Sequence, residues 1–147
     1  MKLFVASLLV LGALAAPAYG ANPLGASATL TPGSAGSKAT LALKLRYSMQ
    51  CGQPGPGSVI VQLPARMHPM SSLAVRMNST QIMGAKVSGT TVTIPLPTHK
   101  GITCMVVGPG VVTVDLVGVR NPATAGTYVV RAHVRGMDFA ASVAVRA

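Results

Sequence analysis

The residues with the most scope for specific chemistry lie in a methionine-rich stretch in the middle of the chain. Met67, His68 and Met70 stand within four positions, and Met77 follows them. Thioether sulfur is a soft ligand that suits Cu(I), and an imidazole nitrogen can join it. The stretch therefore supports copper binding as one hypothesis. The alternative is structural and needs no cofactor, because methionine also fills irregular gaps in protein cores.

Acid–base catalysis has little material in this sequence. The chain contains two acidic residues, Asp115 and Asp138. Hydrolysis requires paired carboxylates or a nucleophile with a base and an acid. No Gly-x-Ser-x-Gly elbow is present. We therefore expect a protein that is not an enzyme.

Positive charge dominates the chain, with twelve lysine and arginine residues and a net charge of +10 at pH 7. Such charge favours anionic partners. Lys44 and Arg46 are predicted on the solvent face of one strand, and Arg131 and Arg135 on that of another. If these strands share a sheet, the four side chains form a basic platform whose binding is sensitive to salt. The alternative is that the charge only keeps an apolar chain in solution.

Nucleic acid is not an expected partner, because aromatic residues make up only 3% of the chain. Single-stranded nucleic acids are bound largely by stacking of bases on aromatic rings. An anionic envelope polymer or another protein remains as the expected partner, and the sequence does not identify it further.

Strict alternation defines the elements that must position these side chains. From Lys38 to Met49 apolar and polar residues alternate, as in a strand with one buried face. Turns rich in glycine and proline separate further runs of this kind. The other expected strands are Ser58–Leu63, Leu73–Met77, a hairpin over Lys86–Leu96 with its turn at Ser88–Gly89, Ile102–Val107, Val111–Val119, Tyr128–Arg135 and Phe139–Val145.

The pattern predicts an all-β protein, an immunoglobulin-like sandwich of about seven to nine antiparallel strands. We place this domain at residues 38–147. Residues 21–37 are rich in glycine, proline, serine and alanine. They are expected to form a flexible leader that can add an edge strand near Ala28–Leu30.

The N-terminus has the features of a secretory signal peptide. A positively charged start is followed by an apolar run and by small residues around Gly20. We expect residues 1–20 to be removed by cleavage after Gly20, with Ala18 as the alternative. The mature chain is then secreted or periplasmic, and we expect no transmembrane segment in it. In an oxidising compartment the two cysteines, Cys51 and Cys104, are expected to form a disulfide.

One segment resembles the penultimate-strand region of bacterial secreted and cell-surface immunoglobulin-like domains. It carries Asn121, Pro122, Ala125, Gly126 and Tyr128 in the order Asn-Pro-x-x-Ala-Gly-x-Tyr. The resemblance implies a sandwich in which Asn121, Gly126 and Tyr128 are structural, with the tyrosine hydroxyl bonded to loop backbone. It does not identify a function, because this fold serves many roles.

These observations favour an exported, non-enzymatic module that binds a protein or an anionic polymer through its loops or its basic face. The main alternative is an exported copper-binding protein. A third interpretation is a purely structural component of the envelope.

Overall fold

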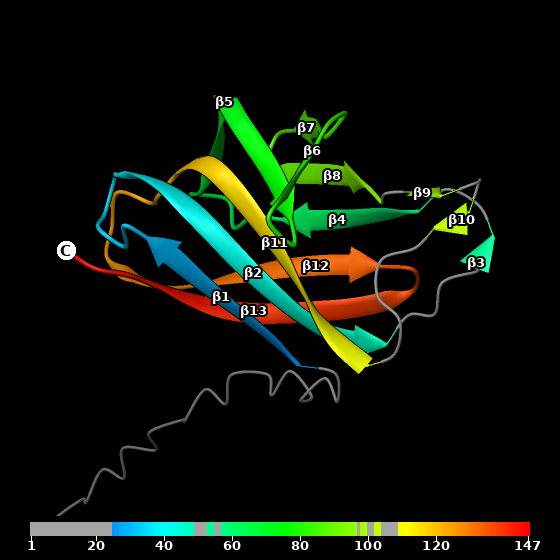
Figure 1. Ribbon diagram of the computed structural model, residues 1–147. Helices are drawn as coiled ribbons and strands as arrows, with labels where there is room; N and C mark the ends of the chain where they lie inside the picture. Colours follow the sequence, from blue (N-terminus) through cyan, green and yellow to red (C-terminus); the bar gives the residue numbers. More distant parts are fainter. Residues whose placement is uncertain (1–24, 49–52, 55–56, 97, 100–101, 104–108) are drawn as a thin grey trace, which may run out of the picture.

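The computed structural model describes residues 25–48, 53–54, 57–96, 98–99, 102–103 and 109–147, all drawn in colour in Figure 1. The predicted signal peptide and both cysteines lie outside these residues. The strands are β1 Ala26–Thr31, β2 Lys38–Ser48, β3 Gln53–Pro54, β4 Ser58–Gln62, β5 His68–Met77, β6 Thr80–Ile82, β7 Lys86–Ser88, β8 Thr91–Pro95, β9 Thr98–His99, β10 Ile102–Thr103, β11 Pro109–Arg120, β12 Gly126–Val134 and β13 Met137–Val145.

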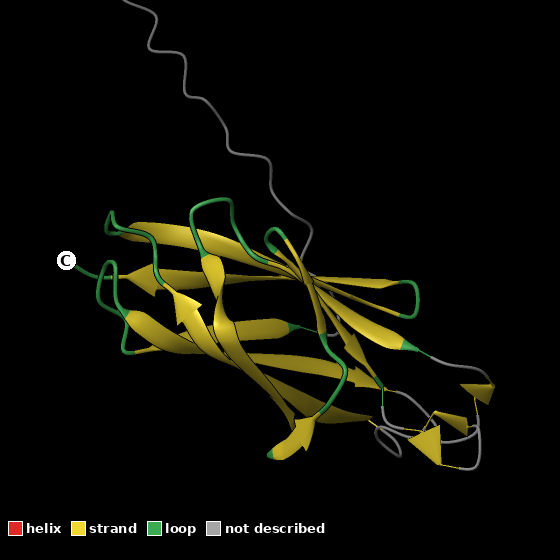
Figure 2. Ribbon diagram, turned by 90° about the horizontal axis from the view of Figure 1, so that it is seen from above, coloured by secondary structure: helices red, strands yellow, loops and turns green. Residues whose placement is uncertain are grey.

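Two five-stranded antiparallel sheets form the body of the molecule. One has the order β1-β2-β11-β5-β6, and the other has the order β13-β12-β4-β8-β7. They lie face to face as two layers, and the strands of one cross those of the other obliquely (Figures 1 and 2). The predicted immunoglobulin-like sandwich is therefore confirmed, with slightly more strands than expected. None of the described residues forms a helix long and apolar enough to cross a membrane.

The core lies between the two sheets and follows the alternation of the sequence. On β2, Leu41, Leu43 and Leu45 are buried, whereas Lys44 and Arg46 are exposed. The predicted hairpin is confirmed as β7 and β8, which pair from Lys86 to Thr93 around the turn at Gly89. Burial of each large aliphatic side chain stabilises the fold by about 1.5–3 kcal/mol.

A bulge at Gly118 interrupts the alternation on β11. Val117 pairs with Thr40 but Val119 pairs with Ala39, so β11 has one extra residue there. Simple alternation from the buried Val112, Val114 and Leu116 would turn residue 120 inward. The bulge instead buries Val119 and leaves Arg120 exposed. Gly118 has a φ of +101°, which residues with a side chain rarely adopt.

We expect Gly118→Ala to lower the free energy of unfolding by about 1–3 kcal/mol, because it forces a side chain into this backbone conformation. Urea denaturation measures the change. Gly126→Ala is the control, since its added methyl group would meet only the Tyr128 ring at an ordinary distance of 3.7 Å. Equal effects of the two substitutions would contradict a special role for the bulge.

The segment before β2 belongs to the sandwich, so the predicted domain boundary at residue 38 is too late. β1 is an edge strand paired with β2 from Ala26 to Thr31, where an edge strand was expected. The loop 32–37 that follows is not a loose leader, because it is bonded to Asn121. The Nδ2 of this buried side chain donates to Pro32 O at 3.0 Å, Ser34 O at 2.9 Å and Ser37 Oγ at 3.2 Å.

Tyr128 lies at the same end of the molecule, near the start of β12. Its hydroxyl donates to the Thr124 carbonyl at 2.8 Å and so ties the turn after Asn121 to the strand. Gly126 lies beside the ring. This geometry is that of a tyrosine corner, in which the hydroxyl bonds to backbone a few residues upstream.

A small third sheet lies at the end of the sandwich opposite the C-terminus (Figures 1 and 2). Its order is β3-β10-β9, and each strand has two residues. Thr103 is opposite both Gln53 and Thr98. The connection between β2 and β4 therefore meets the connection between β8 and β11 at this end. Of its three strands, only β10 lies within a predicted strand, Ile102–Val107, and the described part of β10 is two residues long.

Candidate functional site

The methionine-rich stretch does not form one ligand set. Met67 and Met77 are fully buried in the core, whereas His68 is exposed. His68 and Met77 are at opposite ends of β5, facing Arg120 and Val114 on β11. Six residues of extended strand separate those partners, a distance of about 20 Å. The structure therefore excludes Met77 from any site that includes His68, and it places Met67 and Met77 where methionine serves as packing.

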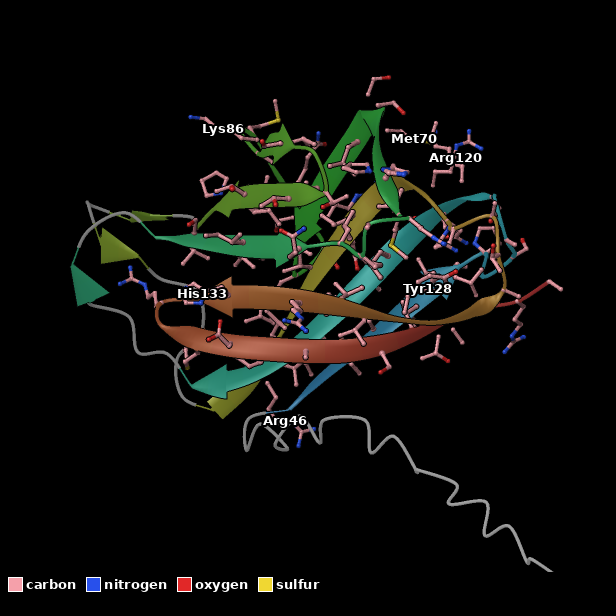
Figure 3. All side chains as sticks on the ribbon, turned by 180° about the vertical axis from the view of Figure 1, so that it is seen from behind. Arg46, Met70, Lys86, Arg120, Tyr128 and His133 are labelled. Carbon is pink, nitrogen blue, oxygen red and sulfur yellow. The ribbon has the colours of Figure 1, made fainter. Side chains whose placement is uncertain are left out.

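Met70 belongs to a second irregularity, on β5. Residues 70–73 stand between Pro69, which faces Val119, and Ala74, which faces Val117, so several residues of β5 have no partner on β11. For this reason β5 begins at His68, earlier than the Leu73 expected from alternation. Met70 is half-buried, and it lies at the same end of the molecule as Arg120 (Figure 3). In the described part of the chain, no three His, Cys, Asp or Glu side chains gather where they could hold a metal ion.

One titratable pair was not expected from the sequence. His133 and Asp138 face each other across the β12–β13 hairpin, with Nδ1 and Oδ1 2.8 Å apart. The backbone N–H of Gly136 donates to Nε2 of the same ring at 3.4 Å. A neutral imidazole protonated on Nδ1 satisfies both contacts. These two contacts tie the His133 ring into the turn between β12 and β13.

The four residues of the predicted basic platform lie on two different sheets. Lys44 and Arg46 are on β2, and Arg131 is on β12 with Arg135 directly after it. The outer faces of the two sheets point in opposite directions, so the platform does not exist as predicted. Alternation had indicated which residues face solvent, but it cannot reveal which strands share a sheet.

A groove runs along the edge where β1 and β13 approach each other. Small side chains line most of it, including Ala28, Ser142 and Ala144. Arg146 is the one titratable side chain among its lining residues. The groove therefore lacks the paired acid and base groups that hydrolysis requires.

The end that carries the small third sheet is the remaining candidate for a contact surface. Leu96 N–H donates to Gly57 O at 2.9 Å, which joins the ends of β8 and β4 where the two connections leave the sandwich. In sequence these connections, residues 49–57 and 97–108, contain no acidic residue, no arginine and a single lysine, Lys100. We call this region the third-sheet end. Its apolar residues in sequence are Met49, Ile102, Met105, Val106 and Val107.

Comparison with known proteins gives similarity of fold without a family. No protein-family model matches the chain, and no curated protein matches it in sequence. Among solved structures, the chain is similar to "BslA - A bacterial hydrophobin", with 23% identity, a TM-score of 0.55 and coverage of 82% of this chain and 94% of that one.

Two further structures are similar at lower identity. BcpA, the major pilin subunit of Bacillus cereus, matches with 10% identity and a TM-score of 0.52 over 82% of this chain and 40% of that one. A protein from Nocardia farcinica with an immunoglobulin-like fold matches with 14% identity and a TM-score of 0.36, over 78% and 81% of the two chains. The two matches with TM-scores above 0.5 establish that the chain shares a fold with those structures.

Proposed function

We propose that this protein is exported, is not an enzyme, and acts as an amphiphilic module that adheres to apolar interfaces through the third-sheet end. The observation that carries the proposal is the third sheet itself, which brings together two long connections with a single lysine between them. On the described residues, the exposed large hydrophobic side chains are Met83, Val87, Val111 and Val129. The likeness to a structure titled as a bacterial hydrophobin supports the same role.

The energetics of such adhesion are those of the hydrophobic effect. An Ile, Met or Val side chain that leaves water contributes about 1.5–3 kcal/mol. The five apolar residues of the third-sheet end would together contribute on the order of 10 kcal/mol if all of them left water. That is comparable to the free energy of a specific protein complex.

We expect the purified protein to lower the tension of an oil–water interface. Val106→Lys should raise the protein concentration that this requires at least about tenfold, since a valine that leaves water contributes at least about 1.5 kcal/mol. Pendant-drop tensiometry measures the change. Val129→Lys is the matched control, because Val129 is 38% exposed on a strand of the sandwich body. A wild-type protein without effect on the tension would contradict the proposal, as would an equal loss in both variants.

A further inference from the structure

The end of the sandwich opposite the third-sheet end carries a row of basic side chains that the linear sequence conceals. Arg120, the last residue of β11, lies opposite Lys38 on β2 and opposite His68 on β5. All three residues are exposed. Neighbouring strands are about 4.8 Å apart, so the row spans about 10 Å. We call these three residues the basic row.

The two irregular strands create this row. The bulge at Gly118 turns Arg120 to the outside, where regular alternation would have buried it. Lys38 keeps the regular alternation of β2, because it is exposed and the next residue, Ala39, is buried and pairs with Val119. The unpaired residues of β5 bring His68 level with Arg120. Side chains of directly opposed residues have Cβ atoms about 4.5–5.5 Å apart, so the ammonium, the guanidinium and the imidazole can reach one anionic group.

Arg120 is held in place before any ligand arrives. Its Nη1 donates to Gly36 O at 3.0 Å, and the loop that contains Gly36 is bonded to the buried Asn121. A guanidinium has five N–H donors, and its remaining donors make no other hydrogen bond to the described protein. Preorganisation of this kind lowers the conformational entropy lost on binding.

Neither acidic side chain of the described residues lies next to the row. None of its three residues makes an ion pair. Asp115 lies in the middle of the same sheet, opposite Ala42 and Arg76, and Asp138 lies beside His133 in the other sheet. Like charges on directly opposed residues are destabilising, so the row has an unfavourable self-energy that a bound anion would remove. Figure 3 shows Arg120 and His133 at opposite ends of the molecule.

Two more cations approach this end. Arg66 is exposed in the turn that leads into β5, and Arg146 follows β13, where its N–H donates to Gly33 O at 2.8 Å. Lys44, Arg46 and Arg76 add positive charge farther along the same sheet, where Asp115 lies opposite Arg76 and between the basic row and Lys44. The positive charge at this end of the molecule is therefore greater than a single small anion would neutralise.

We propose that the basic row binds the phosphate groups of an extended polyanion. A tetrahedral phosphate offers several acceptor oxygens, which suits a guanidinium fork between an ammonium and an imidazole. The remaining cations of the face then follow the next charges of the polymer. The proposal is independent of adhesion by the third-sheet end, and together the two would orient the molecule between a polyanion and an apolar interface.

Titration of the purified protein with fluorescently labelled linear polyphosphate tests the proposal. We expect Lys38→Gln to raise the Kd about tenfold, because charge-assisted hydrogen bonds contribute more than neutral ones. Lys86→Gln, the same change at an exposed residue of the other sheet, should change the Kd less than about twofold. Arg120→Gln should behave as Lys38→Gln does, with its folding checked by circular dichroism.

Three outcomes would overturn the inference. Equal weakening by Lys38→Gln and Lys86→Gln would show that only net charge matters. Absence of binding to the wild-type protein at low salt would exclude the site. Inorganic phosphate that competes as well as polyphosphate, at equal phosphate concentration, would show that the ligand is a single anion and not a polymer. Interfacial tension measured on the same Lys38→Gln protein should be unchanged, which separates this result from the proposed adhesion.

Discussion

Removal of the predicted disulfide should lower the free energy of unfolding by roughly 3–4 kcal/mol. Cys51 and Cys104 would close a long loop, and the restriction of the unfolded chain grows with loop length. The residues next to them are paired in the structure, since Gln53 lies opposite Thr103. Cys104 directly follows Thr103 in sequence, and Cys51 precedes Gln53 by two residues. These pairings support a bond that fastens the two connections of the third-sheet end together.

Guanidinium denaturation of the exported protein, with and without reductant, measures this effect. A Cys51→Ser/Cys104→Ser protein is the control, because reductant should not change its stability further. Titration of thiols in the native exported protein should detect none. Two free thiols in that material, or identical unfolding curves with and without reductant, would show that the disulfide does not exist.

The local part of the fold could be predicted because it depends on neighbours in sequence. Alternation over Lys38–Met49 correctly gave a strand with leucines inside, and the turn at Ser88–Gly89 correctly gave a hairpin. These features require only that a pleated strand places successive side chains on opposite faces. Where a strand contains an extra residue this rule fails, as at Gly118.

The partners of each strand could not be predicted, because sheet order depends on contacts between residues far apart in sequence. Lys44 and Arg131 were rightly placed on polar faces, but their strands lie in different sheets. Lys38, His68 and Arg120 are distant in sequence and lie in one row. The candidate sites on this protein therefore follow from topology, and composition could only indicate that basic residues were abundant.

Asn121 shows the same limit within a motif that the sequence did reveal. The order Asn-Pro-x-x-Ala-Gly-x-Tyr indicated a turn, and the turn is present. The side chain of Asn121, however, bonds to a loop 84 to 89 residues away, which no local pattern could show. The same loop holds Arg120 through Gly36, so one buried amide supports both the N-terminal edge of the sandwich and the basic row.

Replacement of this amide should produce the second large effect. We expect Asn121→Ala to lower the free energy of unfolding by roughly 2–3 kcal/mol, because the loop 32–37 loses the part-buried hydrogen bonds that the buried amide donates to it. Asn121→Asp should be worse at neutral pH, since it has nearly the same shape but points carboxylate oxygens at Pro32 O and Ser34 O. Burial beside these carbonyl oxygens raises the pKa of the introduced carboxyl, because both factors disfavour its charged form.

The sign of the pH dependence distinguishes this mechanism from a simple loss of packing. A carboxyl whose pKa is raised by folding stabilises the folded state below its unfolded pKa, and this contribution is lost as the pH rises through the folded pKa. Asn121→Asp should therefore approach the stability of Asn121→Ala near pH 4 and fall below it at pH 7, as measured by thermal unfolding. The difference in stability between Asn121→Ala and the wild-type protein should not change with pH, so it serves as the reference. If Asn121→Asp were as stable as the wild-type protein at pH 7, the donated hydrogen bonds would not be what holds the loop.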